Sequence, residues 1–484
     1  MTTSNPTISE HEDFGEFCRL TATDAVGLLR KGEVSPGELV EASIARIEAV
    51  DGDINALPIH RFEQAREDAE KFDLKTHKDN PKSLCGLPIA VKDYNDVKGS
   101  VTTYGSPIFA ENVAAASDAT VRQLEQNGAI HVAKSNVPEW AGGNTLNPVF
   151  GASRNPWDLR MSVGGSSGGS AAALASGQVW LATGNDLGGS LRTPAAFNGI
   201  VGLRPGPGRV PRGTRLPSMD TLWVEGPMAR NVADLALMLD AGVGQQIDDP
   251  LSFDQSATSF VDALGKGEFP KRVAFSPDLG IVSMEKEIAS VAGNAARIFA
   301  DMGADITGDI PDFTGVLEAF QTHRAVLFAT LMEPILAEHR DRIAPEIIGN
   351  IQRGLNIQPS QIFEAERVRC DLYKKMMAFF ETHDVLVCPA ASIAPFPVEQ
   401  RYVEEIDGKA CETYIDWFSI TFALTMTACP TMSVPCGFTA EGLPVGVQLM
   451  GRPRGEAELL RAAKHFETAA NIATQLPINP RKKG

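Results

Sequence analysis

Residues 162–196 read SVGGSSGGSAAALASGQVWLATGNDLGGSLRTPAA and place a Gly/Ser cluster on each side of a short apolar run. The run Val179–Thr183 has the composition of a buried strand. Glycine serves where the backbone takes a positive φ or where another chain segment approaches closely. Tight turns explain one such cluster about as well as a functional site does, but two clusters beside one strand favour a site.

Strand and helix patterns alternate on both sides of this stretch, which is typical of an α/β fold. No low-complexity linker and no repeat of fixed period interrupts the alternation. We therefore predict one domain over 1–484, with a helical flank over about 1–65 and a helical insertion over about 314–383. The expected strands are Leu87–Val91, Ala129–Ala133, Lys271–Ser276, Asp384–Cys388 and Val445–Met450, and the expected helices are Asp118–Asn127, Glu285–Met302, Tyr414–Ala428 and one that begins at Glu456.

Composition narrows the class of protein and of partner. The 484 residues are 43% hydrophobic and 22% charged, which is ordinary for a globular protein with a large core. The formal charge of −17 would repel a polyanion, so we expect no nucleic-acid partner. The longest apolar stretch, Ala325–Leu336, is short and contains Glu333, so no membrane span is expected. Seven scattered cysteines and no visible secretory signal predict reduced thiols and a cytoplasmic location, and a homodimer is left open.

Several kinds of catalytic or binding site fit the two clusters poorly. A phosphate loop would need GxxxxGK followed by Ser or Thr, and no lysine follows either cluster. Gly164–Gly168 matches GxSxG, but the preceding RNPWDLRMSV is polar where a nucleophile elbow needs a buried strand. The eight histidines are dispersed and HExxH is absent, so we expect no metal.

A serine whose base is not histidine remains. A serine hydroxyl needs a group that takes its proton, and lysine can do this when burial keeps its amine neutral. Lys92 ends the apolar strand Leu87–Val91 and fits that requirement. Against this, most strand-end lysines reach solvent.

Six segments together resemble the amidase signature family, in the family's order and over most of the chain from about Ser35 to Ile472. The resemblance implies an α/β/α sandwich around a large mixed β-sheet with helical flanks, and hydrolysis of linear amides by a Ser-cisSer-Lys triad without a cofactor. The matching segments are LPIAVKD (87–93), AKSNVPEWA (133–141), FGASRNPWD (150–158), GGSSGGSAAA (164–173), GNDLGGSLRTPAAFNGIVGLRP (184–205) and CPTMSVPCGFTAEGLPVGVQLMG (429–451).

The resemblance also implies a role for each matched residue. Ser190 is the nucleophile, Ser166 the proton relay and Lys92 the base, and Ser167 is the neighbour that competes with Ser166 for the relay assignment. The backbone N–H groups of Leu187, Gly188, Gly189 and Ser190 form the oxyanion hole, the Trp140 carbonyl borders the site, and Asp186 and Arg192 orient the nucleophile loop.

Departures from the family pattern bear on the substrate. Asn185 stands where the family usually has Thr or Ser, a feature that resembles hydrolases of cyclic and linear aminohexanoate amides. We predict a neutral, partly apolar small amide, bound against Trp140 and the helix that carries Trp417, Phe418 and Phe422, although Asp416 would favour a cationic group. The alternatives are the glutaminase subunit of a tRNA-dependent amidotransferase and a non-catalytic binding protein on the same fold.

Overall fold

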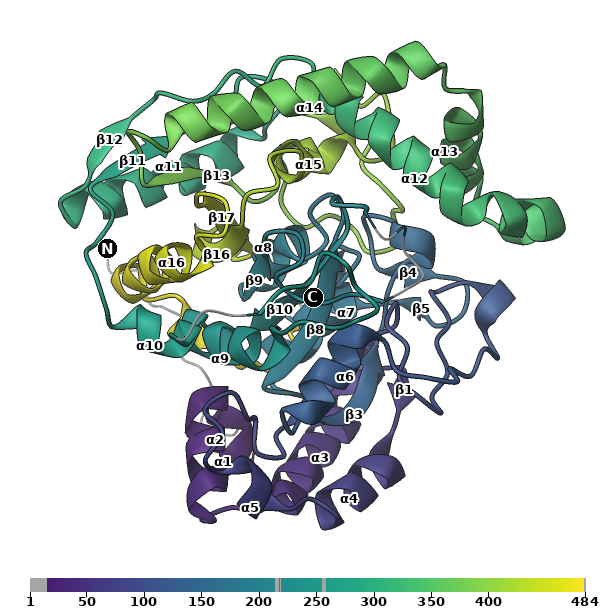
Figure 1. Ribbon diagram of the computed structural model, residues 1–484, viewed down its shortest axis with the longest axis vertical. Helices are drawn as coiled ribbons and strands as arrows, with labels where there is room; N and C mark the ends of the chain where they lie inside the picture. The colour runs from purple at the N-terminus through teal and green to yellow at the C-terminus, as the bar shows by residue number, and fades with distance from the viewer. Residues whose placement is uncertain (1–14, 214–216, 218, 255–257, 483–484) are drawn as a thin grey trace.

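The computed structural model describes residues 15–213, 217, 219–254 and 258–482. In this part of the chain, eleven strands form one mixed sheet that runs through the middle of the molecule (Figure 1). Their order across the sheet is β1 (Ile59–His60), β3 (Ile130–Ser135), β2 (Pro88–Lys92), β8 (Leu181–Asp186), β10 (Val224–Ala229), β9 (Val201–Arg204), β16 (Thr431–Phe438), β17 (Pro444–Met450), β13 (Val385–Pro389), β11 (Arg272–Phe275) and β12 (Asp305–Thr307).

The central strands are buried on both faces because successive side chains point to opposite sides of a sheet. In β8, Leu181 packs into one apolar cluster and Ala182 into another on the opposite face. Ile89 and Ala90 of β2 divide between the same two clusters. A strand of this kind carries no polar side, which is why these segments read as continuous apolar runs in the sequence.

Helices cover both faces, as the predicted α/β/α sandwich requires. One face packs against α2 (Ala22–Lys31), α9 (Val232–Gly242), α10 (Phe260–Leu264), α11 (Lys286–Asp301) and α16 (Glu456–Ala470). The other packs against α3 (Pro36–Ile54), α7 (Gly168–Ala175) and α8 (Arg192–Asn198). Shorter elements complete the fold: α1 (Glu16–Arg19), α4 (Phe62–Glu70), α5 (Leu74–His77), α6 (Ala119–Gln126), η1 (Pro107–Phe109), η2 (Glu139–Ala141), η5 (Ala473–Gln475) and the hairpins β4 (Leu146–Asn147) with β5 (Gly151–Ala152), β6 (Arg154–Asn155) with β7 (Asp158–Ser162), and β14 (Glu405–Ile406) with β15 (Lys409–Ala410).

Residues 314–383 are mostly helical, and their apolar core includes Ala274 of β11 and Leu386 of β13, so they cover one face of that part of the sheet (Figure 1). This region consists of α12 (Val316–His339), η3 (Arg340–Arg342), α13 (Pro345–Asn356) and α14 (Pro359–Phe379). It packs against α15 (Ser419–Thr425), which follows the short turn η4 (Asp416–Phe418). The single helix expected over Tyr414–Ala428 is therefore wrong in extent, because the chain forms a tight turn before α15 begins. Among the described residues, no helix has both the length and the apolar composition that a membrane crossing requires.

Helix α7 lies unusually close to its neighbours because its sequence, GGSAAALA, contains only one side chain larger than serine. A Cβ added to Gly169 would stand 2.4 Å from the backbone nitrogen of Asn136 and 2.5 Å from the carbonyl oxygen of Ala56. Backbone atoms cannot move aside as a flexible side chain can. The glycines at the start of α7 therefore set how closely this helix, and the loop before it, approach the sheet.

Gly169→Ala should lower the free energy of unfolding by about 1–3 kcal/mol, because the new methyl group overpacks against backbone. Gly293→Ala is the matched control, since Gly293 lies inside α11 and an added Cβ has no heavy atom within 4 Å. That substitution should stabilise by about 0.5–1 kcal/mol through helix propensity. Urea unfolding of both variants measures the two effects, and equal shifts of the same sign would contradict this account of α7 packing.

Candidate active site

The site lies at one edge of the sheet, where two neighbouring parallel strands end. Strands β2 and β8 pair in parallel, with Ile89 opposite Leu181, so their carboxyl ends meet at the same edge. Lys92 is the last residue of β2 and Asp186 the last of β8. The Lys92 backbone N–H donates to the Thr183 hydroxyl at 2.8 Å and fixes the end of β2 against β8. In open α/β sheets, ligands bind outside this edge.

The Lys92 amine has no exposed surface and is surrounded by uncharged oxygen atoms. Its Nζ lies 2.6 Å from Asn185 Oδ1, 2.7 Å from Ser166 Oγ and 2.8 Å from Ser167 Oγ. Gly165 and Ser166 are joined by a cis peptide bond, and Ser167 is the N-cap residue of α7. Lys92 Nζ therefore contacts both Ser166 and Ser167, the two serines that compete for the relay assignment.

Burial lowers the pKa of Lys92 well below its ordinary value, and the negative charges of Glu225 and Asp186 offset only part of this effect. Lys134 of β3, which is also fully buried, provides a contrast. Its Nζ lies 2.6 Å from Asp93 Oδ1, in a buried ion pair. Lys92 has no carboxylate in direct contact among the described residues, and that difference favours a neutral amine at Lys92.

Ser190 lies beside the serines that contact Lys92. Its backbone carbonyl accepts a hydrogen bond from the Ser167 N–H at 3.2 Å. It precedes α8, whose first turn is tied back by the Thr193 N–H to the Gly189 carbonyl at 2.8 Å. Between residues 162 and 206, Ser190 is the one residue that is not buried. A hydroxyl that reaches a substrate needs that exposure.

The buried carboxylate of Asp186 holds the loop that precedes Ser190. It accepts from the N–H groups of Gly189 at 2.8 Å and Leu191 at 3.2 Å, and from Arg192 at 3.0 Å. Burial raises the pKa of Asp186, but the charges of Arg192 and Arg204 together with these hydrogen bonds outweigh it and hold the pKa at about 2. Asp186 therefore fixes two backbone N–H groups of this loop and pairs with Arg192.

One predicted oxyanion donor is corrected by this geometry. The Gly189 N–H already donates to Asp186, so it does not point into the site. The N–H groups of Leu187, Gly188 and Ser190 have no hydrogen-bond acceptor among the described residues and stay candidates for the oxyanion hole. The sequence motif could not show which N–H the Asp186 carboxylate takes.

Helix α15 supports the loop that precedes Ser190, and its residues are not among those that line the cavity near Tyr94. The Thr421 hydroxyl donates to the Gly188 carbonyl at 2.7 Å, and Arg192 donates to the Thr421 carbonyl at 2.8 Å. Trp417 and Phe422 are fully buried in apolar clusters. The prediction that these rings line the substrate pocket is wrong for Trp417 and Phe422, which fill the core, whereas the half-buried Phe418 of η4 stays a prediction. Asp416 accepts hydrogen bonds from the backbone N–H groups of Glu412 and Thr413.

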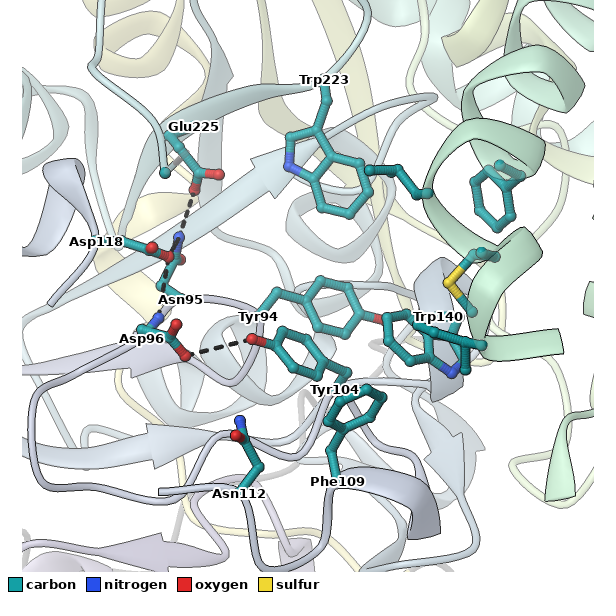
Figure 2. A pocket seen from close by; sticks show the side chains of 15 residues that line it. Tyr94, Asn95, Asp96, Tyr104, Phe109, Asn112, Asp118, Trp140, Trp223 and Glu225 are labelled. Atoms are coloured by element: carbon teal, nitrogen blue, oxygen red, sulfur yellow. Dashed lines mark hydrogen bonds between the residues drawn. The ribbon is translucent and has the colours of Figure 1, made fainter. Parts of the chain in front are cut away.

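A cavity of about 350 Å³ lies near the site (Figure 2), but Lys92, Ser166 and Ser190 are not among the residues that line it. The ring of Tyr94 forms part of its wall, and the Lys92 amine lies 4.8 Å from the centroid of that ring. Trp140 stacks on Tyr104 with ring centroids 5.2 Å apart. The cavity wall is mostly apolar and comes from segments far apart in the sequence: Tyr94, Tyr104, Phe109, Trp140, Trp223 and the α12 residues Phe328, Leu331, Met332 and Ile335.

One end of the cavity is polar. Asn95 donates to Glu225 at 3.2 Å, and Figure 2 shows Asp96, Asp118 and Glu225 grouped on the side away from Trp140. Burial and the nearby charge of Asp118 raise the pKa of Glu225 to about 7, although Lys92 lowers it. The sequence analysis missed Tyr94 and Glu225. Tyr94 follows the AVKD motif directly, which is a signal that could have placed it beside Lys92.

No set of three or more His, Cys, Asp or Glu side chains in the described ranges could hold a metal ion. The arrangement at the sheet edge is instead one of hydroxyl groups, a buried amine and backbone N–H donors. Such a set can activate a serine and stabilise an oxyanion, which are the needs of acyl transfer.

Asp186→Asn should lower the free energy of unfolding by about 3–5 kcal/mol, because it leaves the buried guanidinium groups of Arg192 and Arg204 without their counter-charge. The folded pKa of about 2 lies below the ordinary 3.8, so the contribution of Asp186 is complete above pH about 4 and is lost as the pH falls toward 2. Glu41→Gln, which breaks an exposed ion pair with Arg66, is the control and should change stability little. Chemical unfolding at neutral pH compares them, and a loss for Asp186→Asn no larger than the control's would contradict this role.

Comparisons with known proteins agree with the geometry. The family model described as Amidase matches residues 38–460. The chain is 35% identical to an acylamidase of Rhodococcus erythropolis, over 95% of this chain and 97% of that protein. It is 31% identical to a glutamyl-tRNA(Gln) amidotransferase subunit of Moorella thermoacetica, over 96% of this chain and 99% of that protein.

Two solved structures share the fold over nearly the whole chain. A bacterial aryl acylamidase of the amidase signature family superposes with a TM-score of 0.86 at 27% identity, covering 95% of this chain and 99% of that one. A 6-aminohexanoate cyclic dimer hydrolase in complex with its substrate gives 0.85 at 26% identity, with the same coverage. The chain therefore belongs to the amidase signature family and is a hydrolase of carbon–nitrogen bonds other than peptide bonds.

Proposed function

We propose that this chain hydrolyses a small, uncharged and partly apolar amide through an acyl-enzyme on Ser190, with Ser166 as proton relay and Lys92 as base. The observation that carries the proposal is the fully buried Lys92 amine, which lies 2.7 Å from Ser166 and has no carboxylate in contact among the described residues. An amine in that environment is neutral and can accept a proton. Ser190 is partly exposed, and its backbone carbonyl accepts a hydrogen bond from the Ser167 N–H, so we assign it as the residue that reaches the substrate.

The reaction then divides into two acyl transfers. Ser190 Oγ attacks the amide carbon while its proton passes to Ser166 Oγ, and the Ser166 proton passes to Lys92 Nζ. The oxyanion of the tetrahedral intermediate accepts hydrogen bonds from the N–H groups of Leu187, Gly188 and Ser190, each worth about 3 kcal/mol in such sites. The proton returns from Lys92 through Ser166 to the leaving nitrogen, and the C–N bond breaks. Water then cleaves the ester by the same route and restores Ser190.

The cavity near the site supports a partly apolar substrate. Aromatic rings and a row of α12 side chains offer an apolar surface, and small-ligand sites of about 300 Å³ or more are commonly lined in this way. Trp140, which the family motif places at the site, is one of those rings. Its backbone lies in the left-handed region, with φ 47° and ψ 52°, which turns its carbonyl differently from those of its neighbours.

The second candidate is a glutaminase subunit of an amidotransferase, favoured by the 31% identity to the amidotransferase protein from Moorella thermoacetica. Two observations weigh against it. The formal charge of −17 opposes work on a complex that holds tRNA. The cavity wall is also mostly apolar and has polar side chains at one end only, whereas glutamine carries polar groups at both of its ends.

Ser190→Ala should lower kcat about 10⁴-fold or more on any amide that the parent cleaves, because no other group can form the acyl-enzyme. Ser166→Ala and Lys92→Ala should keep a small residual activity from the oxyanion hole and binding, and Ser167→Ala should lose less than Ser166→Ala. Ser176→Ala is the control, because its hydroxyl bonds only the backbone and Gln178 at the end of α7. Steady-state kinetics on purified variants test this, and near-parental turnover by Ser190→Ala would refute the nucleophile.

A panel of aryl amides, fatty amides, aminohexanoate oligomers and glutamine should show kcat/KM for an uncharged apolar amide more than tenfold above that for glutamine, about 1.4 kcal/mol in transition-state binding. Trp223→Ala should narrow this preference by removing cavity wall, whereas Phe363→Ala, on an exposed position of α14, should not. A tenfold preference for glutamine would instead support the glutaminase.

A further inference from the structure

Asn185 makes the shortest polar contact of the Lys92 amine. Its Oδ1 lies 2.6 Å from Nζ, closer than either serine hydroxyl, and its backbone carbonyl lies at 3.4 Å. Asn185 belongs to β8 and stands opposite Glu225 of β10 in the sheet. The residue was singled out in the sequence only because the family usually has Thr or Ser there. Asn185 takes no part in the proton transfers proposed among Ser190, Ser166 and Lys92.

The hydrogen-bond capacity of a neutral amine shows what this contact does. A neutral lysine has two N–H donors and one lone pair, and three short contacts surround Nζ. The Asn185 amide oxygen can only accept, so it takes one N–H. The Ser167 hydroxyl donates to the Asn185 carbonyl at 3.4 Å, so its oxygen accepts the second N–H. The lone pair is then left for the Ser166 hydroxyl.

We infer that Asn185 is a positioning residue that, together with Ser167, occupies both N–H bonds of neutral Lys92 and thereby turns its lone pair toward Ser166. The inference rests on the proposed function, because an oriented lone pair matters only if Lys92 is the base. It also assigns the relay: Ser167 accepts a hydrogen bond from Lys92, while Ser166 donates one to it. Ser166 Oγ consequently keeps its own acceptor capacity for the Ser190 proton.

The Nδ2 atom of the Asn185 amide indicates that the residue does not serve a purely structural role. Its Nδ2 is buried and has no hydrogen-bond partner among the residues that the structure describes. A buried donor without a partner costs stability, so the Nδ2 atom does not explain why an asparagine stands here. The hydrogen bond that Asn185 Oδ1 accepts from Lys92 is therefore the contact that holds the amide in place.

The charged groups that act on the Lys92 amine are Asp186 from β8 and Glu225 from β10, and both favour its protonated form. The ring of Tyr94 and the hydroxyls of Ser166 and Ser167 complete its surroundings. Asn185 thus supplies a strong acceptor without adding a third negative charge. A carboxylate in its place would hold Lys92 as an ammonium ion, and an alkyl group would leave one N–H without an acceptor.

The test is the pKa of Lys92 in Asn185→Asp and Asn185→Leu, read from the Cε resonances of protein labelled with [¹³Cε]lysine and assigned by the loss of one signal in Lys92→Met. In Asn185→Asp the Lys92 pKa should rise by about one unit or more, since an opposite charge in contact has effects of this size. In Asn185→Leu it should fall, and kcat should drop about tenfold or more with KM changing less. The two variants shift in opposite directions, so the test survives if one of them fails to fold.

Asn127→Asp is the matched control, because the Asn127 amide bonds the carbonyls of Gln123 and Ala241 and no residue of the site. It should lower the melting temperature and leave the Lys92 pKa unchanged. An unmoved Lys92 pKa in the folded Asn185 variants would overturn the inference. The Lys92 pKa is measured without turnover, so this test of Asn185 does not depend on activity. The proposed function has its own test and is refuted if the parent protein cleaves no amide.

Discussion

An amine kept entirely out of water is the constraint on which the site depends. Lys92 is fully buried, and an ammonium ion there would need a counter-charge in contact. Lys134, on the neighbouring strand, has one in Asp93. Lys92 is surrounded by hydroxyl and amide oxygens instead, so burial favours a neutral amine at Lys92, whereas at Lys134 it accompanies an ion pair.

A second buried group of charges, Asp186 with Arg192 and Arg204, positions the backbone before Ser190 and takes no part in the proposed proton transfer. Asp186 is held ionised by Arg192 and Arg204, and its oxygens fix the N–H groups of Gly189 and Leu191. Arg192 in turn bonds Gln448 of β17 at 2.8 Å, so the nucleophile loop is tied to the far side of the sheet. Hydrogen bonds thereby hold the loop that carries Ser190, and the sheet edge brings it beside the serines that contact the Lys92 amine.

Much of this was readable from the sequence where local signals are strong. The strand that ends at Lys92 and the helix that begins at Glu456 have short-range determinants, and the structure has both. Strand β10 was missed because Gly226 and Pro227 disfavour a central strand, and only its partners on both sides explain it. The cavity was misplaced for a similar reason: Tyr94, Trp223 and α12 meet only through the fold, while the aromatic helix that looked like a pocket wall is core.

The central claim is that acyl transfer proceeds through Ser190 and depends on the neutral Lys92. A fluorophosphonate that mimics the tetrahedral intermediate should label the chain once, and peptide mass spectrometry should place the adduct on Ser190. The labelling rate should collapse in Lys92→Met while the protein stays folded. An adduct on Ser166 or Ser167, or equal labelling without the Lys92 amine, would contradict the account.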